Sequence, residues 1–283
     1  MEKFLTTRVK AWFAIAIVAV LLVLGYFTLW KNPSHTWKML QPIDVSGEKT
    51  WRMAFSPDNK YLAVGTDEGI QVMDLALNKF VPEMKVKTSF VTNLCFSPDA
   101  TRLVASDYQG EVRAWEFPSM RLLRAWKVPE PETAIFRFSP RGDRLAYLNR
   151  QDARLLDGKT YEEVVRLKDV GSQSFSMDFS PDGSTLVVAG DGHLLCFDAS
   201  NGSKRGSIWL DQYFEEPRFS PDGTKIVCHA PDDNVYVLDV KSGRIVSTLT
   251  GLSQGACFAR FLPDGKTVVT TDWDGPAVLW DVT

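Results

Sequence analysis

The sequence is poor in cysteine and histidine, and neither sign of charge dominates it. Its 283 residues include 4 cysteines and 3 histidines, and 32 Lys and Arg stand against 35 Asp and Glu. So few scattered cysteines do not build a disulfide scaffold in a chain of this length. The net charge of -3 argues against general nucleic-acid binding, which needs a basic surface. With 19 glycines and 15 prolines, the chain is neither collagen-like nor broadly disordered.

One long apolar run lies near the amino terminus. Residues 11–30 contain neither a charge nor a proline, and a helix of that length spans about 30 Å, the thickness of a hydrocarbon core. The alternatives are a buried soluble helix and a cleaved signal peptide, but no Ala-x-Ala-like site follows the run. It predicts a transmembrane anchor between a basic head (1–10) and a tether (31–35). The amino terminus would be cytoplasmic and the following domain periplasmic or luminal.

A five-residue turn motif recurs six times in the rest of the chain. Its copies are 40 to 42 residues apart. Ser at the first turn position, Pro at the second and Gly at the fourth are typical of a type I turn. Where Gly is absent, Asn59 adopts a left-handed conformation more readily than Ala100. The copies are Phe55–Asn59, Phe96–Ala100, Phe138–Gly142, Phe179–Gly183, Phe219–Gly223 and Phe261–Gly265.

A second mark, which ends in an acidic residue, follows each turn. It reads Val72-Met73-Asp74, Ala114-Trp115-Glu116, Leu155-Leu156-Asp157, Cys196-Phe197-Asp198, Val237-Leu238-Asp239 and Leu279-Trp280-Asp281. Short runs between the marks, such as 186–189 and 235–238, are rich in β-branched and aliphatic residues. They predict strands in sheets that are packed on both faces. A period near forty with four strands per copy is typical of stacked propeller blades.

These residues resemble the WD-repeat family of β-propellers over residues 36–283. Trp280-Asp281 is the family's ending in full, and Trp115-Glu116 and Phe197-Asp198 are close variants. The resemblance implies a turn Asp seven residues before each terminal acid, from which Gln109 and Arg150 depart. The residues that match this role are Asp67, Asp191, Asp232 and Asp274. The family's Gly-His pair is absent, so we expect these blades to rely more on apolar packing.

The ends of the repeat region predict how the ring closes. The sixth copy stops at Thr283 without an outer strand, and residues 36–43 resemble the outer strands at 120–126 and 244–249. The amino-terminal segment would complete the last blade and so remove exposed sheet edges. The predicted fold is therefore all-β. It is a six-bladed WD-repeat-like β-propeller, closed by an N-terminal outer strand and preceded by one transmembrane helix.

The two faces of the predicted ring differ in composition. Loops that enter each first strand share a face with the turns before each third strand, and the anchor would direct this face away from the membrane. Aromatic and Arg side chains on an exposed rim are typical of binding hot spots. The alternative is that the rings are wedged between blades. The candidate partner-binding residues are Phe90, Tyr108, Arg150, Tyr213 and Trp273.

The resemblance also implies a role in protein assemblies. We therefore predict a membrane-anchored, non-enzymatic scaffold for protein partners, which does not bind nucleic acid. The alternatives are a propeller that binds a small molecule or glycan in its central funnel, and a hydrolase that uses funnel carboxylates. Raised carboxylate pKa values would favour the hydrolase. His193 and His229 lie near Asp191, Asp232 and Asp233, but a metal needs three or four converging ligands. We expect no metal, no cofactor and no catalytic residue.

Overall fold

A computed structural model shows strands arranged in six antiparallel sheets. It describes residues 45, 49–131, 134–150, 152–171, 174–190, 192–209, 214–252, 256–272 and 277–283. Each sheet contains one copy of the repeated turn, which joins its first strand to its second.

The bounds of the strands follow the repeats. The first sheet contains β1 (Thr50–Phe55), β2 (Tyr61–Thr66), β3 (Gly69–Asp74), β4 (Lys79–Phe80) and β5 (Val86–Lys87), with a 3-10 turn, η1 (Pro82–Met84), before β5. The second contains β6 (Val91–Phe96), β7 (Arg102–Asp107), β8 (Glu111–Glu116) and β9 (Arg121–Lys127), and the third β10 (Ile135–Phe138), β11 (Arg144–Leu148), β12 (Ala153–Asp157) and β13 (Glu163–Arg166). The fourth contains β14 (Ser174–Phe179), β15 (Thr185–Gly190), β16 (His193–Asp198) and β17 (Lys204–Trp209). The fifth contains β18 (Glu215–Phe219), β19 (Lys225–His229), β20 (Val235–Asp239) and β21 (Ile245–Leu249), and the sixth β22 (Ala256–Phe261), β23 (Thr267–Asp272) and β24 (Val278–Asp281).

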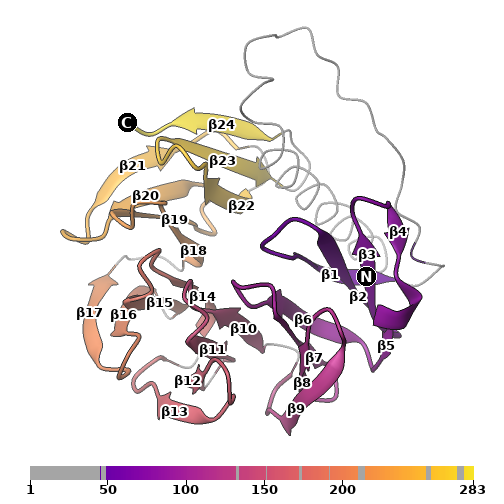
Figure 1. The fold of residues 1–283 in the computed structure, drawn as a ribbon. Coiled ribbons are helices and arrows are strands. Elements are labelled where there is room, and N and C mark those ends of the chain that lie inside the picture. The colour runs from indigo at the N-terminus through magenta and orange to yellow at the C-terminus, as the bar shows by residue number, and fades with distance from the viewer. Residues whose placement is uncertain are drawn as a thin grey trace, which may run out of the picture.

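The sheets follow one another around a common centre (Figure 1). Within each sheet, strands that are consecutive in the chain pair as antiparallel neighbours, except that β5 pairs with β3 rather than with β4. The first strands, β1, β6, β10, β14, β18 and β22, are innermost, and β9, β13, β17 and β21 lie at the periphery (Figure 1). This is the arrangement of blades in a β-propeller.

The repeated turn is held by its own side chains. In the second sheet the Ser97 hydroxyl donates to Asp99 Oδ1 at 2.5 Å and accepts from the Arg102 N–H at 3.0 Å. The Ala100 N–H donates to Ser97 O at 2.9 Å, which confirms the predicted hydrogen-bonded turn. The fourth residue has a positive φ in every copy: 58° at Asn59, 55° at Ala100, 70° at Gly142 and Gly183, 72° at Gly223 and 66° at Gly265.

The hydrophobic core lies between neighbouring sheets. Val104 and Val112 of the second sheet pack with Phe136 and Tyr147 of the third, and all four side chains are buried. Leu103 on the other face of β7 is fully buried against the first sheet. Burial of such a side chain contributes about 1.5–3 kcal/mol. Apolar packing on both faces therefore explains why the strands have few alternating polar positions.

The expected fold class was wrong in one respect. It placed a transmembrane helix before the propeller, but no helix within the described residues has the length and apolar character that a membrane crossing requires. The apolar runs there form strands of at most 7 residues, far shorter than a spanning helix. The described fold is all-β and propeller-like, without a transmembrane helix.

The other predictions for the amino-terminal region fall on residues outside the described part. These are the head (1–10), the segment expected to form the anchor (11–30), the tether (31–35) and the closing strand (36–43). The extracytoplasmic location that was inferred from the anchor stays a prediction.

Candidate functional site

The predicted partner-binding rim lies where second and third strands are joined. Tyr108, in the β7–β8 turn, is 60% exposed. Its N–H donates to Phe90 O at 2.8 Å, and the two rings meet edge to face at 6.0 Å. Arg150 is exposed in the β11–β12 turn and, among the described residues, makes no hydrogen bond, ion pair or ring contact with either of them. The structure thus brings Phe90 and Tyr108 together. Tyr213 and Trp273 lie outside the described residues.

The predicted turn acids are described at two positions. Asp67, in the β2–β3 turn, accepts a hydrogen bond from the Lys49 N–H at 3.1 Å. Asp232, in the β19–β20 turn, accepts from the Asn234 N–H at 3.2 Å and from the Tyr236 hydroxyl at 2.5 Å. Both carboxylates therefore lie in turns on the rim face. The other two residues in this prediction, Asp191 and Asp274, lie outside the described residues.

Two further turn residues were missed by the sequence analysis. Asp107 is 3% exposed and braces the turn that carries Tyr108. Its Oδ1 accepts from the N–H groups of Gln109 and Glu111, each at 3.0 Å, and its Oδ2 accepts from the Thr88 hydroxyl at 2.7 Å. In the next sheet, the buried Asn149 accepts from the Asp152 N–H at 2.7 Å through its Oδ1.

Counting back from the terminal acid missed these residues because the turns before the third strands differ in length. Two residues separate β2 from β3, three separate β7 from β8 and four separate β11 from β12. Counting forward from the turn Ser places these two residues, since Asp107 and Asn149 each lie ten residues after it, whereas Asp67 and Asp232 lie eleven and twelve residues after theirs.

A second group missed by the sequence analysis lines the centre of the ring. The residue directly before the repeated Phe is charged in four of the six copies. Each such residue occupies the same place in a first strand, one position before the strand ends. They are Ala54, Cys95, Arg137, Asp178, Arg218 and Arg260. Aligning the six copies on this Phe would have exposed the pattern.

The four charged residues of this group form ion pairs with one another or with Glu216 of β18. Arg137 Nη1 lies 3.3 Å from Asp178 Oδ1, across the boundary between the third and fourth sheets. Glu216 Oε2 lies 3.1 Å from Arg260 Nη2 and 3.5 Å from Arg218 Nη2. Glu216 thus joins Arg218 and Arg260, whereas Arg137 and Asp178 form a separate pair.

Burial and charge shift the pKa values in this network. Burial and the positive charges of Arg137 and Arg260 lower the pKa of Arg218 well below its ordinary value. Burial alone would raise the pKa of Glu216, but Arg218 and Arg260 outweigh that effect and lower it to about 2. Burial lowers the pKa of His229, at the end of β19, so its imidazole is neutral at neutral pH.

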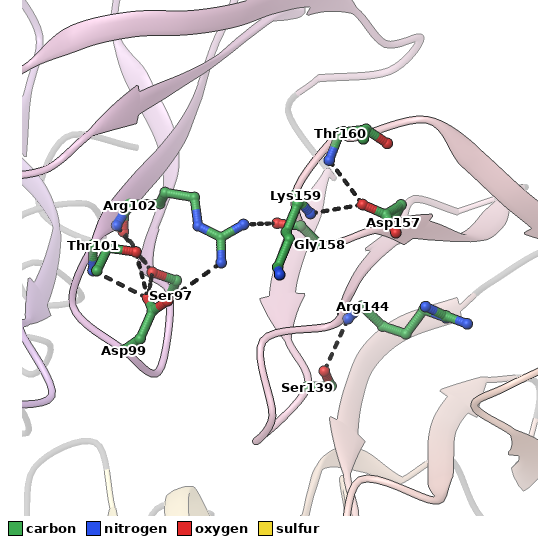
Figure 2. Close-up of polar contacts among 10 residues, drawn as sticks. All are labelled: Ser97, Asp99, Thr101, Arg102, Ser139, Arg144, Asp157, Gly158, Lys159 and Thr160. Carbon is green, nitrogen blue, oxygen red and sulfur yellow. Dashed lines mark hydrogen bonds and ion pairs between the residues drawn. The ribbon is translucent and has the colours of Figure 1, made fainter.

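The opposite face carries a polar joint between the second and third sheets (Figure 2). Arg102 Nη1 donates to the carbonyl oxygen of Gly158, and its Nη2 lies 3.5 Å from Asp99 Oδ2. The guanidinium also lies over the Phe138 ring, 5.8 Å from its centre. A side chain at Gly158 would clash here, since a Cβ would lie 2.1 Å from the carbonyl oxygen of Gly142. The joint satisfies its own polar groups and has a structural role.

The two described histidines take part in different contacts. His193 lies against the exposed ring of Trp209, with ring centres 3.7 Å apart. His229 is buried, and the charge of Glu216 acts on it. Within the described part of the chain, no three His, Cys, Asp or Glu side chains are grouped so that they could hold a metal ion.

Comparison with known proteins identifies the repeats. Residues 78–116 and 169–198 match the family model described as "WD domain, G-beta repeat". These segments are WD40 repeats. Each match ends on an acid that closes a third strand, Glu116 of β8 or Asp198 of β16, where the resemblance placed the end of a repeat.

The relatives that this chain resembles are larger proteins. Over 164 residues it is 25% identical to the target of rapamycin complex subunit wat1 of Schizosaccharomyces pombe, covering 56% of this chain and 48% of that protein. Over 270 residues it is 23% identical to the DDB1- and CUL4-associated factor 11 homolog of Caenorhabditis elegans, covering 84% and 45%. Over 163 residues it is 23% identical to the U3 small nucleolar RNA-associated protein 21 homolog of S. pombe, covering 57% and 18%. The chain thus spans less than half of each relative.

Proposed function

We propose that this WD40-repeat chain is a non-enzymatic scaffold that binds a protein partner on its rim, at Tyr108 and Phe90. The observation that carries the proposal is the exposed Tyr108 ring on a braced turn. A Tyr that is 60% exposed and pairs with a second aromatic ring offers apolar area and a hydroxyl group to a partner.

The turn beneath Tyr108 favours binding because it is already ordered. Asp107 holds three hydrogen bonds within and around this turn, and the Tyr108 N–H is bonded to Phe90 O. A side chain with two rotatable bonds on a fixed turn loses little conformational entropy when a partner covers it. Arg150 of the next sheet adds an exposed cation to the same face.

The names of the relatives support an assembly role. One is a complex subunit and another is an associated factor. Since this chain spans less than half of each, the identity of its own partner does not follow from theirs.

The pKa of Glu216 favours a scaffold over a hydrolase. A general acid at neutral pH needs a raised carboxyl pKa. Glu216 has the opposite shift, to about 2, because Arg218 and Arg260 stabilise its charged form against the effect of burial. It is therefore a structural anion rather than a proton donor.

The test compares two exposed apolar side chains on opposite faces. Tyr108→Ala removes the rim ring, whereas Leu77→Ala removes a side chain that is 69% exposed in the β3–β4 turn, on the face of the Ser-Pro turns. The full chain is captured from its native cells after crosslinking, the recovered partner is identified, and its affinity for both variants is measured. We expect at least about tenfold weaker binding for Tyr108→Ala and none of that loss for Leu77→Ala. The proposal fails if both folded variants bind equally well.

A further inference from the structure

The outer strand of the fifth sheet, β21, lacks the charges that the other outer strands carry. Its sequence is Ile-Val-Ser-Thr-Leu over Ile245–Leu249. In each of the other described sheets the last strand contains at least one charged residue: Lys79 in β4, Arg124 in β9, Arg166 in β13, Lys204 in β17 and Asp281 in β24. Charged side chains on an edge strand oppose pairing with another chain. β21 has no such protection.

The outer edge of β21 is open to another strand. On one side β21 pairs with β20, and no described strand pairs with its other side, which lies at the periphery of the ring (Figure 1). Ile245 and Val246 are 42% and 51% exposed, although both belong to residue types that favour strands. The unpaired edge of a strand presents N–H and C=O groups that a further strand can bond. This edge therefore fits an extended, uncharged segment with β-branched side chains.

β21 is itself a segment of that kind, and it is complementary to a second copy of itself. In an antiparallel pair of β21 strands centred on Ser247, each Ser247 faces its counterpart in the other copy. Val246 then lies opposite Thr248, which are both β-branched residues. At the two ends of the pair, Ile245 lies opposite Leu249. Cross-strand pairs of such side chains stabilise a sheet, and no like charges meet in this arrangement.

The charges beside β21 are complementary in the same arrangement. Arg244 directly precedes β21, and Asp233 lies in the β19–β20 turn near the other end of β21, because Val235 pairs with Leu249. Both charged side chains are exposed, and neither has an ion-pair partner within the described part of the chain. Antiparallel pairing brings Arg244 of one copy to the end that carries Asp233 of the other, two strand spacings or about 10 Å away. The two side chains together can span that gap, and two-fold symmetry gives the attraction twice.

We infer that the chain forms a dimer in which the β21 strands of two copies pair antiparallel, centred on Ser247. The pairing joins two four-stranded sheets into one continuous sheet. Since the contact involves one short strand from each copy, we expect a weak dimer whose population depends on concentration. The turn of Tyr108 belongs to the second sheet and takes no part, so the inference is independent of the proposed rim surface. A dimer would present two rims, which a partner with two binding segments would bind more tightly than one.

Sedimentation of the full chain over a series of concentrations measures the dimer. Val246→Lys should weaken self-association by at least about tenfold, because it places a charge from each copy within the paired edge. The matched control is Val164→Lys, which adds the same charge to the outer strand β13 at a side chain that is 45% exposed. It should leave self-association unchanged. Circular dichroism shows that each variant is folded, and association through any other part of the chain would survive both changes.

Cysteine crosslinking tests the register of the pair. Directly opposed residues have Cβ atoms about 4.5–5.5 Å apart, whereas diagonal neighbours are about 7–8 Å apart. A disulfide needs a Cβ separation of about 3.5–4.5 Å. Ser247→Cys should therefore form a disulfide between two copies under mild oxidation, and Thr248→Cys, which meets its own counterpart diagonally, should form far less. The unaltered chain shows any crosslinking by the native cysteines.

Three results would overturn the inference. The first is a chain that stays monomeric at every concentration, even if another protein binds to β21. The second is equal self-association of Val246→Lys and Val164→Lys. The third is Thr248→Cys crosslinking as readily as Ser247→Cys, because the strands would then meet in another register or not at all.

Discussion

Replacing Ala100 by Gly should stabilise the protein. Ala100 is the fourth residue of the turn in the second sheet and has a φ of 55°, whereas four other copies have Gly at this place. A residue with a Cβ costs about 1–2 kcal/mol in the left-handed region. Gly also makes the unfolded chain more flexible, which lowers the free energy of unfolding by about 0.4–1 kcal/mol. The difference predicts a gain of about 0.5–1 kcal/mol in the free energy of unfolding.

Thermal and urea unfolding of the full chain measure this gain. For a protein of this size it corresponds to a rise of about 1–4 °C in the thermal midpoint. Gly183→Ala is the reverse change, at a φ of 70°. A Cβ there would come no closer than 3.6 Å to another residue, at Pro140 Cδ, which is an ordinary contact. The backbone strain alone should therefore lower stability by about 1 kcal/mol.

The control for the Ala100 change is the same substitution in a strand. Ala125 in β9 is exposed, and its φ is not positive. Ala125→Gly should lower the free energy of unfolding by about 0.5–1 kcal/mol. The glycine makes the unfolded chain more flexible and relieves no backbone strain in the folded strand. If Ala100→Gly raises the free energy of unfolding and Ala125→Gly lowers it, the gain comes from the turn conformation and not from glycine itself. If Ala100→Gly lowers the midpoint, or Gly183→Ala leaves it unchanged, backbone strain does not explain the repeated Gly.

Two further predictions concern other turns. Gly158→Ala should lower the free energy of unfolding by at least about 2 kcal/mol, because the new Cβ would lie 2.1 Å from the carbonyl oxygen of Gly142. An unchanged urea midpoint would contradict this. Hydrogen bonds from Ser180 and Ser184 lower the pKa of Asp182 to about 2. The stability this gives is complete above the unfolded-state pKa of about 4 and is lost as pH falls through the folded-state pKa. Asp182→Asn should therefore flatten the fall in thermal midpoint between about pH 4 and pH 2; an equally steep fall would refute it.

The turns could be predicted from the sequence because their chemistry is local. Ser97, Asp99 and Ala100 lie within four residues of one another, and the hydrogen bonds that define the turn run between them. The acceptors at the rim turns were harder to place, because their distance from the terminal acid varies with turn length. Asp107 and Asn149 share a distance of ten residues from the turn Ser, but Asp67 and Asp232 do not, so no single count finds all four.

The ion pairs between neighbouring sheets could not be predicted in the same way, because they join residues that are far apart in the chain. Arg260 and Glu216 are separated by 44 residues, and their ion pair depends on how adjacent sheets face each other. A single Arg before a Phe gives no indication of its partner. Only the repeat period, combined with the ring, places Arg137, Arg218 and Arg260 at one level.

The rim and the channel are separate in the structure, and this bears on how the protein would work. Tyr108 is held by Asp107 and Phe90 in the second sheet and the loop before it, whereas the arginines belong to the third, fifth and sixth sheets. No described contact links the two groups directly. A partner on the rim would therefore bind without contacting these arginines unless the partner itself reached the centre of the ring.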